Sequence, residues 1–547
     1  MNAKKLWALV LCVAMMAMVF AGCSSSNSAN ILKMGLSGYS GVFNPIISDN
    51  LYDSYVCATI FEGLVKIDEK GEVVGDLATF ELSDDHLTYT FTLKDGIKFS
   101  DGTALTTEDV AFTYRTMAAP YYQGPRAYAV SSLKGYEEFH SGATEEFAGI
   151  EVVDEKTIKF IIADGQAAPS NAENFQYGIL SKDYYAHTTW EELVAKNEKP
   201  MGSGIMVFDS WAPKQYIKLM KNTKYWDPEH AAKIDGVLMS EVPDTSMLQA
   251  LQKGEIDFGM PSASAENLKA LEGMNNINIE KYLGNGYTFM CFNTTRDTLS
   301  DARVRQALIY ALDRKSFIKA EYGEDLAQVG MAPISPTSWA YPEDPTVLNA
   351  YDYDLEKAGQ LMDEAGWTMG EDGFRYKDGQ KFSVNWLVYT DSTWTQTISS
   401  MAADSWKQLG VDLDIQLMDF DTVASRTMDP APADKDFDIY TMGFTLSVDP
   451  DPTGALFDAD AYMIGGFNAS GYRNDRAQEL IKEGRSEFDN EKRKPIYEEF
   501  AKLMNEELPH VILAYRNEIW GVNKRVSGMD LDTYKDWTAC LRDITLS

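Results

Sequence analysis

The stretch from Phe382 to Phe444 alternates between strand and helix patterns, and this feature constrains the fold more than any other. Its predicted elements are, in order, a strand at 382–389, a helix at 397–409, a strand at 411–417, a helix at 421–428 and a strand at 437–444. Gly410 supplies a stop for the first of these helices. Strands that alternate with helices form a sheet covered by helices, so the sequence predicts an α/β fold.

The remaining chain carries similar signals. Thr106 and Asp109 form a capping-box pattern that predicts a helix through Met117. Further predicted elements are strands at 88–93 and 511–522, a hairpin at 152–162, and helices at 244–253, 302–317, 355–365, 475–487 and 491–505. The 547 residues are enough for about three to four folding units.

The N-terminus predicts an export signal. Two lysines precede the apolar run Leu6–Phe20, and small residues follow it. The sequence Ala21-Gly22-Cys23 resembles a bacterial lipobox, with Phe20 where Leu is usual. The resemblance implies a signal peptide at 1–22, a lipidated Cys23 that anchors the protein to the outer face of the cell membrane or in the periplasm, and a Ser-rich tether at 23–30. The alternative is ordinary signal cleavage with Cys23 incidental.

Charge and cysteine content narrow the function. Lys plus Arg number 49 against 83 Asp plus Glu, a formal net charge of −34 that disfavours nucleic acid as a partner. The chain has five cysteines, too few for a disulfide-stapled scaffold. Beyond the N-terminus these are Cys57, Cys291 and Cys540, and we expect at least two of them to be buried thiols.

Catalytic and metal motifs are missing from the sequence. It has no G-x-S-x-G elbow, no Walker A loop, no H-E-x-x-H and no C-x-x-C. The five histidines are scattered, so no metal or other cofactor is expected. With 83 Asp and Glu residues, the sequence could still contain the paired carboxylates of a hydrolase. We therefore expect a tethered binding protein, not an enzyme, with a secreted hydrolase as the alternative.

Several motifs together resemble one family. They are IFEGL (60–64), TYTFTLKDGIKFSDGTALTTEDVAFTY (88–114), MGSGIMVFDSW (201–211), KYWD (224–227), DARVRQALIYALDR (301–314) and WKQLGVDLDIQLMDFDT (406–422). The chain from about Ile31 to about Met529 is similar to the extracellular solute-binding family 5, the peptide-binding proteins of ABC importers.

The resemblance implies a two-lobe periplasmic-binding-protein-like clamp of the class II or cluster C type, with an extra subdomain on lobe one. Lobe one is expected at 31–75, 190–290 and 515–547, the extra subdomain at 76–189, and lobe two at 291–514. Two connections would then cross between the lobes, near 282–293 and 512–522. Such a hinge permits closure over a ligand.

The implied function is a receptor, expected to be a monomer, that captures peptides between its lobes and delivers them to membrane permease subunits. Main-chain hydrogen bonds would supply affinity and side-chain pockets selectivity. Dipeptide-selective members have an Arg near the start of the helix before Trp406, where residues 392–396 offer no cation. This favours oligopeptides. A non-peptide solute such as a metal complex, haem, sugar or opine remains an alternative.

The resemblance also implies ligand contacts. Asp449, with Asp451 in reserve, is expected to take the peptide's α-ammonium, although both acids could merely shape Asp-Pro turns. The weaker candidates are Asp53, Ser54 and Tyr55 before the IFEGL segment, Phe420 and Arg426 at a helix start, and Phe444 at the end of the last predicted strand of 382–444.

Overall fold

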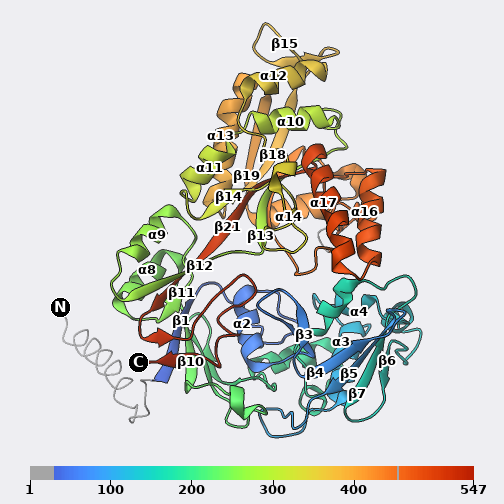
Figure 1. Ribbon diagram of the computed structural model, residues 1–547, viewed down its shortest axis with the longest axis vertical. Helices are drawn as coiled ribbons and strands as arrows, with labels where there is room; N and C mark the ends of the chain where they lie inside the picture. The colour runs from blue at the N-terminus through green and yellow to red at the C-terminus, as the bar shows by residue number, and fades with distance from the viewer. Residues whose placement is uncertain (1–29, 452–454) are drawn as a thin grey trace, which may run out of the picture.

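The computed structural model describes residues 30–451 and 455–547, and Cys23 with the predicted signal peptide lies outside them. Figure 1 shows two α/β lobes joined by one long strand, β21 (His510–Asn523). Among the helices described, none is both long and apolar enough to cross a membrane.

A sheet of twelve strands runs through both lobes in the order β19-β18-β20-β13-β21-β11-β1-β10-β9-β8, with β12 and β14 also paired to β21. The strands at one end are β1 (Ile31–Leu36), β8 (Met206–Ala212), β9 (Tyr216–Lys221), β10 (Gly236–Glu241), β11 (Phe258–Gly259) and β12 (Ile277–Leu283). Those at the other end are β13 (Gly286–Phe292), β14 (Ala327–Val329), β18 (Ser383–Tyr389), β19 (Asp412–Met418) and β20 (Ile439–Thr445).

The long strand β21 links the lobes because its two halves pair with different strands. Residues 510–514 pair with β13, whereas residues 517–523 pair with β12. Only Gly284 and Asn285 separate β12 from β13, so the chain crosses between the lobes here and again within β21. Both crossings fall in the predicted segments. The exact lobe and subdomain boundaries stay a prediction.

A separate antiparallel sheet occupies residues 78–161 in the order β4-β5-β7-β6. These strands are β4 (Ala78–Leu82), β5 (Thr88–Leu93), β6 (Ile150–Val152) and β7 (Thr157–Ile161). The helix α3 (Thr107–Ala118) packs on them and begins with the predicted Thr106–Asp109 capping box. Phe160 and Phe175 have ring centroids 4.7 Å apart in the core that this packing buries.

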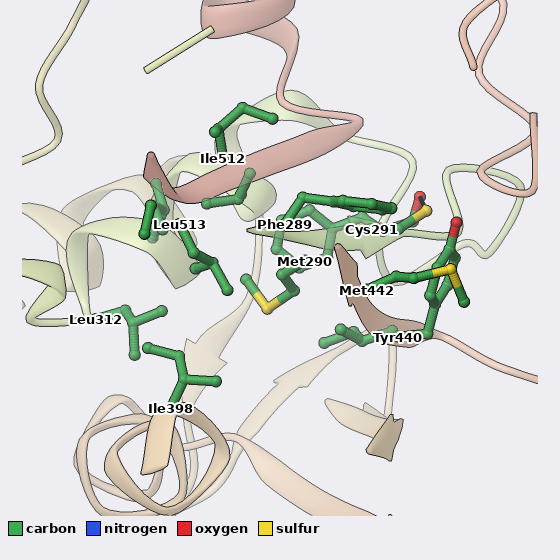
Figure 2. Packing of buried hydrophobic residues seen from close by; sticks show 14 of the residues in the cluster. Phe289, Met290, Cys291, Leu312, Ile398, Tyr440, Met442, Ile512 and Leu513 are labelled. Atoms are coloured by element: carbon green, nitrogen blue, oxygen red, sulfur yellow. Dashed lines mark hydrogen bonds between the residues drawn. The ribbon is translucent and has the colours of Figure 1, made fainter. Parts of the chain in front are cut away.

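Lobe two has a continuous apolar core between its sheet and its helices (Figure 2). β13 contributes Phe289 and Met290, and the lobe-two half of β21 contributes Ile512 and Leu513. The covering helices are α10 (Ala302–Tyr310), α11 (Arg314–Glu321), α12 (Leu355–Glu364), α13 (Thr393–Leu409), α14 (Phe420–Met428), α16 (Asp475–Ser486) and α17 (Asn490–Glu507). Cys57, Cys291 and Cys540 are buried free thiols, as expected for at least two of them.

Most predicted elements are confirmed within a few residues, but the single helix predicted at 302–317 is wrong. The structure has two helices there, α10 and α11. The carboxylate of Asp313 accepts the backbone N–H of Ser316 at 2.9 Å and caps the second helix. A residue that caps a helix start offers the backbone an alternative to continuing the previous helix.

In lobe one, the main helices are α2 (Leu51–Ile60), α8 (Asp244–Lys253) and α9 (Ala265–Glu272).

Candidate functional site

A cleft of about 1110 Å³ lies between the lobes. One wall comes from α2 and from residues 533–542, the other from the end of β20 and the loop after it, and the strands of the hinge form the floor. This volume slightly exceeds the roughly 300–1,000 Å³ of small-molecule pockets. The cleft therefore has room for a ligand larger than a typical metabolite.

The end of β20 offers the cleft an unpaired strand edge. β20 pairs with β13 along its whole length, Ile439–Thr445, but with β18 only at Ile439 and Tyr440. Beyond Tyr440, this second edge has no strand partner in the part of the chain that the structure describes. Gly443, Phe444 and Thr445 of this edge line the cleft. Such an edge can bind an extended backbone by main-chain hydrogen bonds.

Two sequence motifs, at 60–64 and 224–227, meet at the cleft. The carboxylate of Glu62 accepts hydrogen bonds from the Tyr225 hydroxyl at 2.6 Å and the Trp226 indole N–H at 2.8 Å. Burial, with Asp76 nearby, raises the pKa of Glu62 to about 7. Lys66 does not pair with Glu62 but with Asp76, at 2.9 Å. Glu62 thus fixes the aromatic wall of the cleft in place.

Glu173 connects the segment after β7 to the loop after β20. Its Oε1 accepts the backbone N–H of Asp449 at 2.7 Å. Burial raises the pKa of Glu173 to about 7, an effect that the Asp449 charge reinforces and the hydrogen bond opposes. Glu173 also lines the cleft, so this contact closes one side of it.

Asp449, the predicted amine anchor, is not among the residues that line the cleft. Its two carboxylate oxygens accept hydrogen bonds from both terminal nitrogens of Arg493, at 2.7 and 2.8 Å. The Arg493 side chain is 1% exposed and that of Asp449 11%. The residues that line the cleft here are Leu446, Ser447 and Val448, just before the acid.

Asp451, the reserve candidate, is also neutralised within the protein. Its carboxylate accepts from the Arg485 Nε at 2.7 Å and from the Ser170 hydroxyl at 3.1 Å. Burial raises the pKa of Asp451, and Arg485 opposes this rise. Like Glu173, Ser170 lies in the segment after β7, so Asp451 takes part in a second contact between this segment and lobe two.

Of the three candidate residues on α2, one lines the cleft and two do not. Tyr55 lines the cleft. Asp53 is fully buried, and its carboxylate accepts the backbone N–H groups of the loop residues 40, 41 and 42 at 3.0–3.1 Å. Ser54 donates its hydroxyl to the Asn50 carbonyl within the same helix. Asp53 and Ser54 are therefore not among the cleft residues.

Of the three weaker candidate residues on lobe two, two line the cleft and one does not. Phe420 and Phe444 both line the cleft, and Phe420 stands edge-on to Tyr389 with ring centroids 5.4 Å apart. Arg426, one helical turn and a half later, bonds instead to Gln416 at 3.0 Å and Asp436 at 2.8 Å. Phe420 at the helix start thus lines the cleft, whereas Arg426 in the later turn does not.

Sequence reasoning missed several charged cleft residues, chiefly Glu62, Glu173, Arg516 and Glu518. Glu62 lies inside a recognised motif, which was the available signal. Arg516 and Glu518 stand two apart on a predicted strand and so share one face, but no local pattern tells which face meets the cleft. Among the described residues, no cluster of three metal-binding side chains occurs.

Comparison with known proteins identifies the architecture. The model of the bacterial extracellular solute-binding proteins, family 5, matches residues 72–460. The chain is 29% identical to the oligopeptide-binding protein AppA of Bacillus subtilis over 98% of both chains, and 27% identical to the dipeptide-binding protein of Escherichia coli over 97% of both.

A solved structure supports the same conclusion. The structure of B. subtilis AppA in complex with a nonapeptide superposes with a TM-score of 0.75 at 28% identity and covers 94% of this chain and 98% of that one. This confirms the expected α/β two-lobe clamp. The chain belongs to the bacterial extracellular solute-binding proteins of family 5.

Proposed function

We propose that this protein is the receptor of an ABC importer and captures intact oligopeptides in the cleft between its lobes. The observation that carries the proposal is the unpaired edge of β20 within a cleft of about 1110 Å³. An extended peptide can add to this edge, with its side chains on alternate sides. The oligopeptide- and dipeptide-binding relatives support a peptide as the ligand.

The size of the cleft favours oligopeptides over dipeptides, as does the absence of a cation at residues 392–396. Tyr55, Phe420 and Phe444 are the predicted contacts that the cleft presents to such a ligand. For Asp449 to bind the α-ammonium, Arg493 would have to share its partner. The amine-anchor role of Asp449 stays a prediction.

The proposal includes membrane attachment through a lipidated Cys23 and transfer of the peptide to permease subunits. A lipid anchor keeps the receptor near its permease, and the acidic body itself gains nothing from anionic lipid. We also propose that the protein acts as a monomer without enzymatic activity.

The test is incubation of the protein, freed of bound ligand by unfolding and refolding, with a defined mixture of peptides. The proposal predicts that peptides longer than two residues are retained and recovered intact. Shortened products would instead indicate a hydrolase. A protein that retains no peptide but binds a metal complex, haem, sugar or opine would indicate the non-peptide alternative.

A further inference from the structure

Arg516 stands on the floor of the cleft, on the strand that links the lobes. It lies on β21 between the two halves of the hinge, is exposed, and lines the cleft. Its charge opposes the rise in pKa that burial causes at Tyr389, which still reaches about 12. Within the described parts of the chain, Arg516 has neither an ion pair nor a side-chain hydrogen bond.

The other cations that line the cleft already have side-chain partners. Lys66 pairs with Asp76 at 2.9 Å, and His230 pairs with Asp227 at 2.6 Å. Arg542 pairs with Asp543 at 3.4 Å. Lys94 lies over the Trp226 ring, 5.6 Å from its centroid. Arg516 is thus the cleft cation with the most unused binding capacity in the described chain.

Among the described residues, Arg516 supports the fold through its main chain and not through its side chain. The backbone carbonyl of Arg516 accepts the N–H of Gly284 at 3.0 Å, and the residue pairs with Ala327 in the sheet. Both contacts involve only the main chain, so they survive a change of side chain. An exposed cation without a partner, kept at the floor of a cleft, is a candidate for ligand recognition.

Glu518 places a negative charge on the floor of the cleft, near the positive charge of Arg516. It follows Arg516 by two residues on the same face, about 7 Å along the strand. Its carboxylate accepts the Tyr282 hydroxyl at 2.8 Å and thus lies on the lobe-one side, whereas Arg516 pairs in the sheet with Ala327 of β14 on the lobe-two side. Since the protein as a whole has a net charge of −34, an anionic ligand group finds favourable local potential only near such a cation.

We propose that Arg516 binds a carboxylate of the captured peptide and makes affinity depend on that charge. The planar guanidinium presents two parallel N–H donors that match the two oxygens of a carboxylate. Glu518 repels the same group, which fixes it on the lobe-two side. The carboxylate belongs either to the peptide's C-terminus or to an Asp or Glu side chain. This inference rests on the proposed capture of peptides.

The test compares matched peptides on the full chain after removal of bound ligand. The probes are alanine-rich pentapeptides in two arms. The first pairs a free C-terminal carboxylate with its amide, and the second pairs Asp with Asn at each position in amidated peptides. For the parent protein we expect one arm to show a preference for the carboxylate of about tenfold or more, because charge-assisted pairs in a closing cleft are strong.

The variants decide whether Arg516 is responsible. Arg516→Gln should reduce the preference to about onefold, Arg516→Lys should keep part of it, and Arg473→Gln, at an exposed arginine that does not line the cleft, should leave it unchanged. Thermal unfolding checks that each variant is folded. The inference is overturned if peptides bind but Arg516→Gln keeps the parent's preference, or if the parent shows none in either arm. Peptides that fail to bind the parent at all would overturn the proposed function as well.

Discussion

The imidazole of His86, in the extra subdomain, stacks on the ring of Phe488 in lobe two with centroids 3.8 Å apart and planes 7° apart. This contact bridges the lobes, as do the Glu173–Asp449 and Ser170–Asp451 hydrogen bonds. The three contacts join lobe two to the antiparallel sheet β4-β5-β7-β6 and to the segment after β7. In a hinged clamp such contacts set the balance between open and closed forms.

Replacement of Phe488 by Ala should therefore open the clamp. An aromatic pair contributes about 0.5–1.5 kcal/mol beyond its buried area, enough to shift an equilibrium between two forms. Without peptide, small-angle scattering should give a larger radius of gyration for Phe488→Ala than for the parent, and saturating peptide should restore the parent's value. The control is Phe467→Ala, at an exposed ring of lobe two. Identical scattering of Phe488→Ala and parent without peptide would contradict this role.

The general architecture could be predicted from the sequence because it depends on local patterns. The alternation of strands and helices from 382 to 444 and the Thr106–Asp109 capping box are encoded by neighbouring residues, and the structure contains both. The break between α10 and α11 was missed because Asp313 fits a helical pattern until its side chain caps the next helix.

The site was less predictable because its partners are distant in sequence. Asp449 bonds to Arg493, 44 residues later, and Asp53 bonds to a loop that precedes it by 11–13 residues. An acid paired inside the protein and an acid that faces a ligand look alike in the sequence. The aromatic candidates Tyr55, Phe420 and Phe444 all line the cleft, and their contact with a ligand stays a prediction.

Asp449→Ala should strongly destabilise lobe two. The change leaves the Arg493 guanidinium, 1% exposed, without its carboxylate. Removal of one partner of a buried pair typically costs about 3–5 kcal/mol in the free energy of unfolding. Urea titration should show such a loss, whereas Asp436→Ala, which breaks the more exposed pair with Arg426, should cost about 1 kcal/mol or less. Equal losses in the two variants would mean that the Asp449–Arg493 pair does not support the fold.

Stability should fall as the pH rises from about 5 to about 7.5, in part because of Glu62. The pKa of its carboxyl rises from 4.5 to about 7 on folding, so the folded state binds more protons in this range. The contribution of Glu62 to the free energy of unfolding is fully present below the pKa of the unfolded state. It is lost as the pH rises through the pKa of the folded state. Glu62→Gln should flatten the slope of the unfolding free energy against pH, and Glu137→Gln, at an exposed acid, should not. An unchanged slope in Glu62→Gln would exclude this contribution.

Cys23→Ser should abolish lipid attachment if the Ala21-Gly22-Cys23 segment is a lipobox. The variant should appear in the medium or persist as an uncleaved precursor, and it should not incorporate radioactive fatty acid. Fractionation of cells that express parent and variant measures both properties. A variant that still carries the label and remains with the membrane would show that Cys23 is not the lipidated residue.

Capture of intact peptides is tested most directly by native mass spectrometry of the protein as purified. The cleft between the lobes, with its unpaired β20 edge, predicts that the protein carries non-covalent adducts. Acid should release these adducts, and sequencing should identify them as intact peptides of more than two residues. The account would be contradicted by a folded protein that carries no peptide as purified and, after unfolding and refolding, takes up none from a defined peptide mixture.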